Sequence, residues 1–166
     1  MTKKMLVVLL CWGILLSGVA YGESEANTHL QEFVRQVYQD YAAESFAAVY
    51  TEMYPSIQAR VSEDEYVAFQ RGHFERLSLK VRDVEVGTVT ENPRLVRALR
   101  QLLSDDESRQ VFGVEISYAA SFVRGTRYDQ SITKTVYVAV VDWGTAHESI
   151  CLLWDPSAME EEETEQ

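Results

Sequence analysis

TKTVYVAVVDW, residues 133–143, predicts a β-strand that is apolar on both faces, and this strand decides the fold class. Alternation places Val136, Val138 and Val140 on one face and Tyr137, Ala139, Val141 and Trp143 on the other. A strand with two apolar faces needs cover on both of them. We therefore expect this strand in the centre of a sheet.

The residues that follow carry several side chains able to bind metals or transfer protons. Residues 141–155 read VDWGTAHESICLLWD, with two Asp, one His, one Glu and one Cys. A final strand at 149–154 would pair back across a short turn, with His147 and Glu148 at its exposed tip. Because these residues have no recognised ligand spacing, a structural hairpin is favoured over a metal or catalytic site.

Two further strands are predicted upstream. VFGVEISYAASFV at 111–123 alternates in the same way, with residues 125–130 as the connection that follows it. LSLKVRDVEVGTV at 77–89 alternates with a change of phase at Arg82 and Asp83, which indicates a β-bulge. One face of the 111–123 strand would carry Val114, Ile116, Tyr118, Ala120 and Phe122.

The first half of the chain has helical spacing. Apolar residues three and four apart predict a first helix, at Leu30, Phe33, Val34, Val37, Tyr38 and Tyr41. The pattern loses its phase and restarts from Ser45, which predicts a second helix ending near Pro55.

Two more helices have recognisable start signals. Ser62 and Glu65 have the spacing of a capping box, so a third helix is expected to start at Ser62 and to end at Gly72 or soon after. Asn92 and Pro93 are expected to cap and open a short fourth helix.

The N-terminal residues predict export. Lys3 and Lys4 precede an apolar run that ends in small residues, which is the order of a secretory signal peptide at residues 1–22, cleaved after Gly22. An uncleaved anchor is the alternative, but the run is shorter than the roughly 20 residues of a membrane span. We expect a periplasmic or extracellular bacterial protein with no membrane span after cleavage.

Charge and cysteine content restrict the remaining chain. Residues 23–157 are expected to form a single domain, followed by an acidic disordered tail at 158–166. The net charge of −11 makes nucleic acid a poor partner. Cys11 would leave with the signal peptide, and the apolar neighbours of Cys151 favour a buried thiol over a reactive one.

The order of these elements resembles the nuclear transport factor 2-like superfamily. The resemblance rests on HLQEFVRQVYQDYAAESFAAVYTEMYPSIQARVSEDEYVAFQ at 29–70 and ICLLWDPS at 150–157. It implies an α+β fold, in which N-terminal helices pack in the concave face of a curved, mainly antiparallel sheet. In this superfamily the curved sheet and the helices form a cone, and its open end can hold a small apolar ligand.

The superfamily contains enzymes and binding modules, so the fold alone does not choose an activity. We expect the pocket to be lined or flanked by Tyr38, Tyr41, Tyr50, Tyr118, Tyr137 and Trp154, although core packing is the alternative for such aromatic stripes. The favoured hypothesis is a non-catalytic module, without metal or cofactor, that binds a small apolar molecule or an envelope protein. A homodimer through the outer sheet face is a third interpretation.

The catalytic alternative is a cofactor-independent isomerase, dehydratase or cyclase. It would use a buried carboxylate as base, with Asp142 as the candidate, and a Tyr as hydrogen-bond donor. The chain has no H-E-x-x-H, C-x-x-C or G-x-S-x-G motif to indicate another chemistry.

Overall fold

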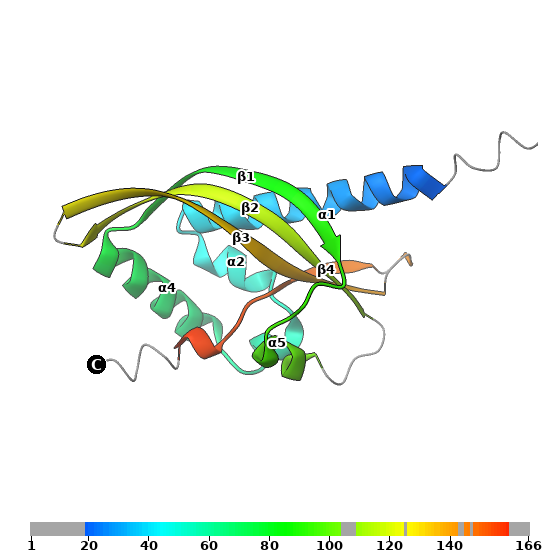
Figure 1. Ribbon diagram of the computed structural model, residues 1–166. Helices are drawn as coiled ribbons and strands as arrows, with labels where there is room; N and C mark the ends of the chain where they lie inside the picture. The colour runs from blue at the N-terminus through cyan, green and yellow to red at the C-terminus, as the bar shows by residue number, and fades with distance from the viewer. Residues whose placement is uncertain (1–18, 104–108, 125, 143–144, 147, 160–166) are drawn as a thin grey trace, which may run out of the picture.

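A curved antiparallel sheet of four strands, in the order β1-β2-β3-β4, is the frame of the protein (Figure 1). The computed structural model describes residues 19–103, 109–124, 126–142, 145–146 and 148–159. The strands span Lys80–Glu91 (β1), Arg109–Arg124 (β2), Thr126–Val141 (β3) and Ser149–Leu153 (β4). Most of the predicted signal peptide and of the acidic tail, together with Trp143, Gly144 and His147, lie outside the described residues.

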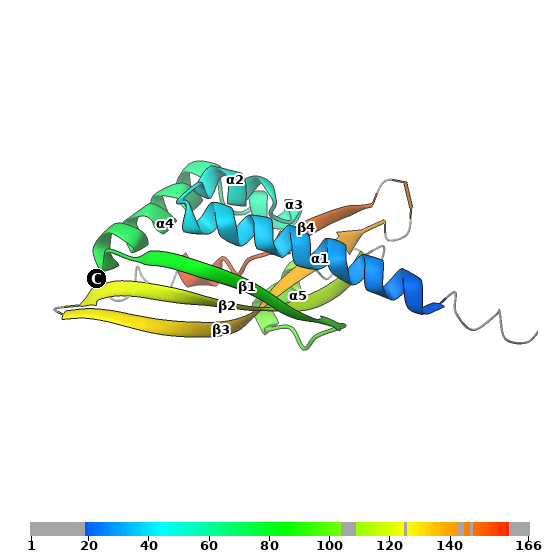
Figure 2. The same ribbon diagram turned by 90° about the horizontal axis from the view of Figure 1, so that it is seen from above.

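The described helices are α1 (Val19–Ala42), α2 (Phe46–Thr51), α3 (Pro55–Gln58), α4 (Glu63–Leu77) and α5 (Arg97–Leu102), and three of them, α1, α2 and α4, lie over the concave face of the sheet. Figure 2 shows α1, α2 and α4 together on one side of the strands. The expected α+β arrangement of helices and a curved antiparallel sheet is therefore confirmed. Among the described helices, none is both long enough and apolar enough to cross a membrane.

The interior forms where the apolar stripe of α1 meets the concave side of the sheet. Leu30 and Val34 of α1 are fully buried, as are Val114 and Ile116 of β2. Val114 lies opposite Val136 of β3, so the predicted apolar faces of the two strands meet on the same side of the sheet. Ala139, on the opposite face of β3, is also buried, which agrees with the expected cover on both faces.

The predicted start of α4 is confirmed, and the helix ends later than the predicted position at or soon after Gly72. Ser62 accepts a hydrogen bond from the Glu65 N–H, and the Glu65 carboxylate accepts one from the Ser62 N–H, so the capping box is complete. The helix then continues through Gly72 to Leu77. Phe74 is buried against Phe46, with ring centroids 5.0 Å apart, and this packing outweighs the low helix propensity of glycine.

The bulge predicted in β1 is confirmed. Its register against β2 shifts between Arg82 and Glu85, and Asp83 has a positive φ of 53°. A second shift, between Val86 and Val89, was not predicted.

The short helix α5 begins later than predicted. Asn92 and Pro93 do not start it, because the Asn92 N–H donates to the Val111 carbonyl and Asn92 has a φ of 47°. The helix spans Arg97–Leu102 and has Val96 at its N-cap.

The connection predicted at residues 125–130 is also wrong, because β3 already begins at Thr126. A cross-strand aromatic pair stabilises this longer hairpin: Phe122 stacks on Tyr128, with ring centroids 5.7 Å apart. The predicted pairing of the last two strands is confirmed, with Tyr137 opposite Leu153.

Two glycines provide a matched test of this packing. A Cβ on Gly113 would lie 2.9 Å from Thr135 Cγ2 and 3.3 Å from Pro93 Cβ, whereas a Cβ on Gly72 would meet nothing within 4 Å. We expect Gly113→Ala to lower the free energy of unfolding by about 1–3 kcal/mol, because the site is already filled. Gly72→Ala should raise it by about 0.5–1 kcal/mol, because alanine loses less backbone entropy in a helix. Urea unfolding of both variants measures the difference, and equal changes would contradict it.

Candidate functional site

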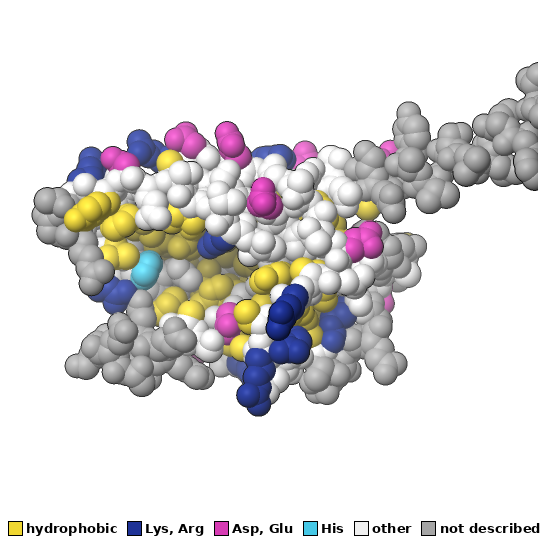
Figure 3. Space-filling view, viewed as in Figure 1, with side chains coloured by type: hydrophobic (Ala, Val, Ile, Leu, Met, Phe, Trp, Pro, Cys, Tyr) yellow, Lys and Arg dark blue, Asp and Glu magenta, His cyan; other side chains and the backbone are white. Residues whose placement is uncertain are grey.

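A cavity of about 300 Å³ opens at the point where β4 ends and leaves the edge of β3 uncovered. Its walls come from α1, α2, α4, α5, β3, β4 and the segment that follows β4. Figure 3 shows the opening as a hollow with apolar side chains inside it, between the sheet and the helices α4 and α5. A cavity of this size matches the lower range of small-molecule pockets.

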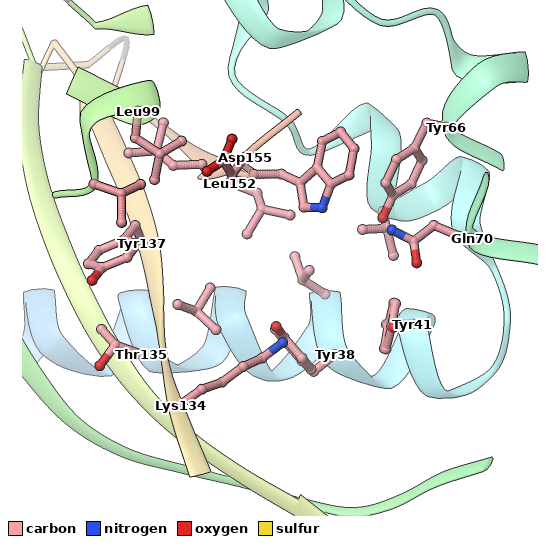
Figure 4. Close-up of a pocket in the computed structure, with 16 residues that line it drawn as sticks. Tyr38, Tyr41, Tyr66, Gln70, Leu99, Lys134, Thr135, Tyr137, Leu152 and Asp155 are labelled. Carbon is pink, nitrogen blue, oxygen red and sulfur yellow. The ribbon is translucent and has the colours of Figure 1, made fainter. Parts of the chain in front are cut away.

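Aromatic side chains form the inner wall of the cavity. Tyr38 and Tyr41 lie one turn apart on α1, with ring centroids separated by 5.8 Å. Tyr66 of α4 meets Trp154 edge to face at 5.1 Å. Figure 4 shows Tyr38 and Tyr41 on one side of the cavity and Tyr66 with Gln70 on another. Rings in such tilted and edge-to-face contacts present a rigid apolar surface to a ligand.

Lys134 is a cation at this aromatic wall. Its Nζ lies 5.2 Å from the ring centroid of Tyr38 and 5.6 Å from that of Tyr118. The side chain reaches from β3 toward Tyr38 (Figure 4). Attraction between the ammonium group and the two ring faces holds the charge beside the cavity. An anionic group on a ligand would find its counter-charge here.

The phenols of the wall stay protonated. Burial raises the pKa of Tyr38, and it is also the main cause that raises the pKa of Tyr41 and of Tyr66. A hydrogen bond with Gln70 opposes the rise at Tyr66. The three hydroxyls are therefore neutral hydrogen-bonding groups at physiological pH.

These raised pKa values predict a loss of stability in alkali. Below the ordinary tyrosine pKa of 10.0, the phenols are neutral in both the folded and the unfolded chain, so their contribution is fully present. Above it the unfolded chain ionises first, and the free energy of unfolding falls as the pH rises toward the folded pKa values. Urea unfolding at about pH 9 and about pH 11 measures this fall. Tyr66→Phe should reduce the slope, and an unchanged slope would contradict the role of Tyr66.

The carboxylate at the cavity already has hydrogen-bond partners. Asp155 Oδ1 accepts hydrogen bonds from the backbone N–H of Ser157 at 3.0 Å and from Ser157 Oγ at 2.7 Å. These bonds fix the turn that leads the chain away from β4. Asp155 therefore has a structural role at the rim of the cavity.

The structure brings together four of the six residues expected at the pocket. Tyr38, Tyr41, Tyr137 and Trp154 line the cavity. Tyr118 lies behind Tyr38, with ring centroids 6.0 Å apart.

Tyr50 and Asp142 lie elsewhere. The Tyr50 hydroxyl donates to the carbonyl oxygens of Gln58 and Val61, which joins α2 to the segment before α4. Asp142 is exposed directly after β3, with a φ of 54°, and is not among the residues that line the cavity.

Tyr66, Gln70 and Lys134 are among the lining residues that were not predicted at the pocket. Lys134 had a usable signal, because it shares the alternation of Val136 and is a charge on an otherwise apolar face. Tyr66 and Gln70 are four residues apart on α4 and had no such signal.

The structure also describes the surroundings of the potential metal ligands and of Cys151. Among the described residues, no three His, Cys, Asp or Glu side chains come together in a way that could hold a metal ion. Cys151 is partly buried, and desolvation raises the pKa of its thiol, which keeps it protonated.

No protein-family model matches the chain, and no curated protein matches it significantly.

Proposed function

We propose that the protein is an exported, non-catalytic binding module with a nuclear transport factor 2-like fold. In this proposal residues 1–22 are removed as a signal peptide and the domain works in the periplasm or outside the cell. Its ligand is a small apolar molecule, or an apolar group of an envelope protein, held in the aromatic cavity.

One observation carries the proposal: the cavity combines a rigid aromatic wall with a single ammonium group. Tyr38, Tyr66 and Trp154 offer ring faces and edges, while Lys134 lies 5.2 Å from the Tyr38 ring centroid. Burial of an apolar group against such a surface is favourable by roughly 25 cal/mol for each Å² removed from water. The cation adds orientation for a ligand with an anionic end.

The polar groups at the cavity suit binding better than proton transfer. The neutral phenols and the Gln70 amide donate and accept hydrogen bonds without changing their protonation at physiological pH. The catalytic alternative needs a carboxylate base facing the ligand. Asp142, the candidate for that role, is exposed at the end of β3, and the carboxylate that does line the cavity, Asp155, already accepts two hydrogen bonds from Ser157.

Native mass spectrometry on the protein purified without refolding tests the proposal. We expect a mass excess that disappears on denaturation. The mass of the denatured polypeptide should be that of a chain that begins at Glu23. Naphthalene-1-acetate, an aromatic ring with one carboxylate, is the defined probe, and calorimetry measures its affinity. A bare mass together with no binding of the probe would contradict the pocket function, and an intact residue 1–22 segment would contradict export.

A further inference from the structure

The edge of β3 is largely uncovered. β4 pairs with β3 only from Tyr137 to Val141, although β3 begins at Thr126. Residues 126–136 therefore have no neighbouring strand on this side within the described part of the chain. The cavity lies beside the inner end of this edge, since Lys134, Thr135 and Val136 line it.

The hydrogen bonds of β4 show which backbone groups point outward from this edge. The Leu152 N–H donates to the Glu52 carbonyl, and the Leu152 carbonyl accepts from the Tyr54 N–H, so Leu152 faces away from β3. Its neighbours in β4 must then bond to β3, because successive residues of a strand point their backbone groups to opposite sides. Leu153 lies opposite Tyr137, so Tyr137 points its N–H and C=O toward β4.

The same alternation continues along β3. Thr135, Thr133 and Ser131 are in phase with Tyr137, so their N–H and C=O groups point to the uncovered edge. The residues between them point their backbone groups toward β2 and belong to its ladder. This leaves a regular row of donors and acceptors beside the cavity.

The two edges of the sheet differ in regularity. β1 forms the other edge, and its register is interrupted twice by shifts against β2. Bulges of this kind are a device by which proteins prevent another strand from pairing. β3 pairs with β2 from Arg124 and Thr126 to Arg109 and Val141 without a shift.

We propose that the uncovered edge of β3 binds an extended peptide segment of another protein as an added antiparallel strand, with one of its apolar side chains in the aromatic cavity. This rests on the binding function proposed above and specifies its partner. Peptide residues opposite Thr133 and Thr135 bond to the edge and direct their side chains to the outer face. The peptide residue between them lies opposite Lys134 and directs its side chain toward the concave face and the cavity.

The partner is a different protein and not a second copy of this chain. Each copy has a net charge of −11, so two copies repel each other when their edges approach. A peptide segment of another protein needs to supply only an apolar side chain, because the walls of the cavity are formed by this chain alone.

The probe is acetyl-VTFTVTE-amide, in which Thr alternates with apolar residues and the whole peptide, with Phe opposite Lys134, stays within the uncovered residues of β3. Two modified forms carry N-methyl groups, one on the Thr residues and the other on the Val and Phe residues. Calorimetry should show that methylation of the Thr set lowers the affinity at least about tenfold, because it removes the N–H groups that donate to the β3 edge. Methylation of the Val and Phe set should change it by less than about threefold, since those N–H groups face away from β3. Equal losses, or loss only in the second set, would overturn the proposal.

A variant pair tests the same edge from the protein side. Thr133→Pro removes an outward N–H without breaking the β2 ladder, and proline is tolerated at such edge positions. We expect Thr133→Pro to lower peptide affinity at least about tenfold while Thr133→Val stays within about threefold of the parent, because only the proline lacks the donor. Both variants should still bind naphthalene-1-acetate. If Thr133→Pro bound the peptide as tightly as the parent protein does, strand addition would be overturned, while the pocket function would remain intact.

Two further results would also overturn the proposal. Sedimentation showing a dimer that Thr133→Pro dissociates would assign the edge to a second copy. Peptide binding that appears only after deletion of residues 160–166 would assign the edge to the chain's own C-terminal residues.

Discussion

Replacing Phe46 with alanine is expected to lower the free energy of unfolding by about 3–5 kcal/mol, the range observed when a buried phenylalanine is truncated. Phe46 is 2 % exposed, and its ring contacts Phe74 at 5.0 Å and Tyr41 at 5.9 Å between centroids. The substitution would leave a void between α1, α2 and α4, which hold one another over the concave face of the sheet. Because a domain is stable by only about 5–15 kcal/mol, this loss would be visible in any unfolding experiment.

The same substitution at Phe122 is the control. Phe122 stacks on Tyr128 near the end of the β2-β3 hairpin, where Tyr128 is 50 % exposed. We expect Phe122→Ala to cost only about 1 kcal/mol, because an aromatic pair at the surface contributes roughly 0.5–1.5 kcal/mol. Guanidinium unfolding of both variants gives the comparison. If the two losses were similar, the helices would not depend on Phe46 as their central contact.

The parts of the fold that were predictable from the sequence are those determined by short-range patterns. Alternation alone identified Val136, Val138 and Val140 as one buried face. The capping box at Ser62 is also local, because its two hydrogen bonds join residues three apart. Such signals need no knowledge of distant residues.

The wrong predictions have non-local causes. Asn92 looked like a helix cap, but its N–H bonds to Val111 on β2, a residue far away in sequence. Gly72 looked like a helix end, but the helix continues because Phe74 packs on Phe46 from a different helix. Both contacts form only after the sheet and helices have come together, so no local pattern could reveal them.

The sequence indicated that aromatic residues would line the candidate site, but it identified only some of the residues that do. Aromatic stripes on the first helix and on β3 indicated Tyr38, Tyr41 and Tyr137, which do line the cavity. Tyr50 belongs to a similar stripe, yet its hydroxyl is used by the carbonyl oxygens of Gln58 and Val61. The cavity exists because β4 ends at Leu153 while β3 continues, and the relative length of two paired strands is set by tertiary structure.

Trp154→Ala is expected to lower the affinity for naphthalene-1-acetate about 30-fold or more, because truncation of a central aromatic anchor typically costs about 2 kcal/mol or more of binding free energy. Trp154 lines the cavity and meets Tyr66 edge to face at 5.1 Å and Phe69 at 6.1 Å. Its loss would remove an aromatic surface from the ligand and also release the Tyr66 ring. Calorimetry with the purified variants measures the change, after thermal unfolding has established that each variant is folded.

Tyr128→Ala is the matched control, since it removes an aromatic ring at a half-exposed position that is not among the cavity residues. We expect its affinity for the probe to stay within about twofold of the parent, as substitutions outside a binding contact have little effect. Trp154→Phe should fall between the two, because a smaller ring retains part of the contact with Tyr66. An unchanged affinity in a folded Trp154→Ala protein would contradict the cavity as the binding site. A ligand that contacts the indole of Trp154 must bind less tightly once that ring is removed.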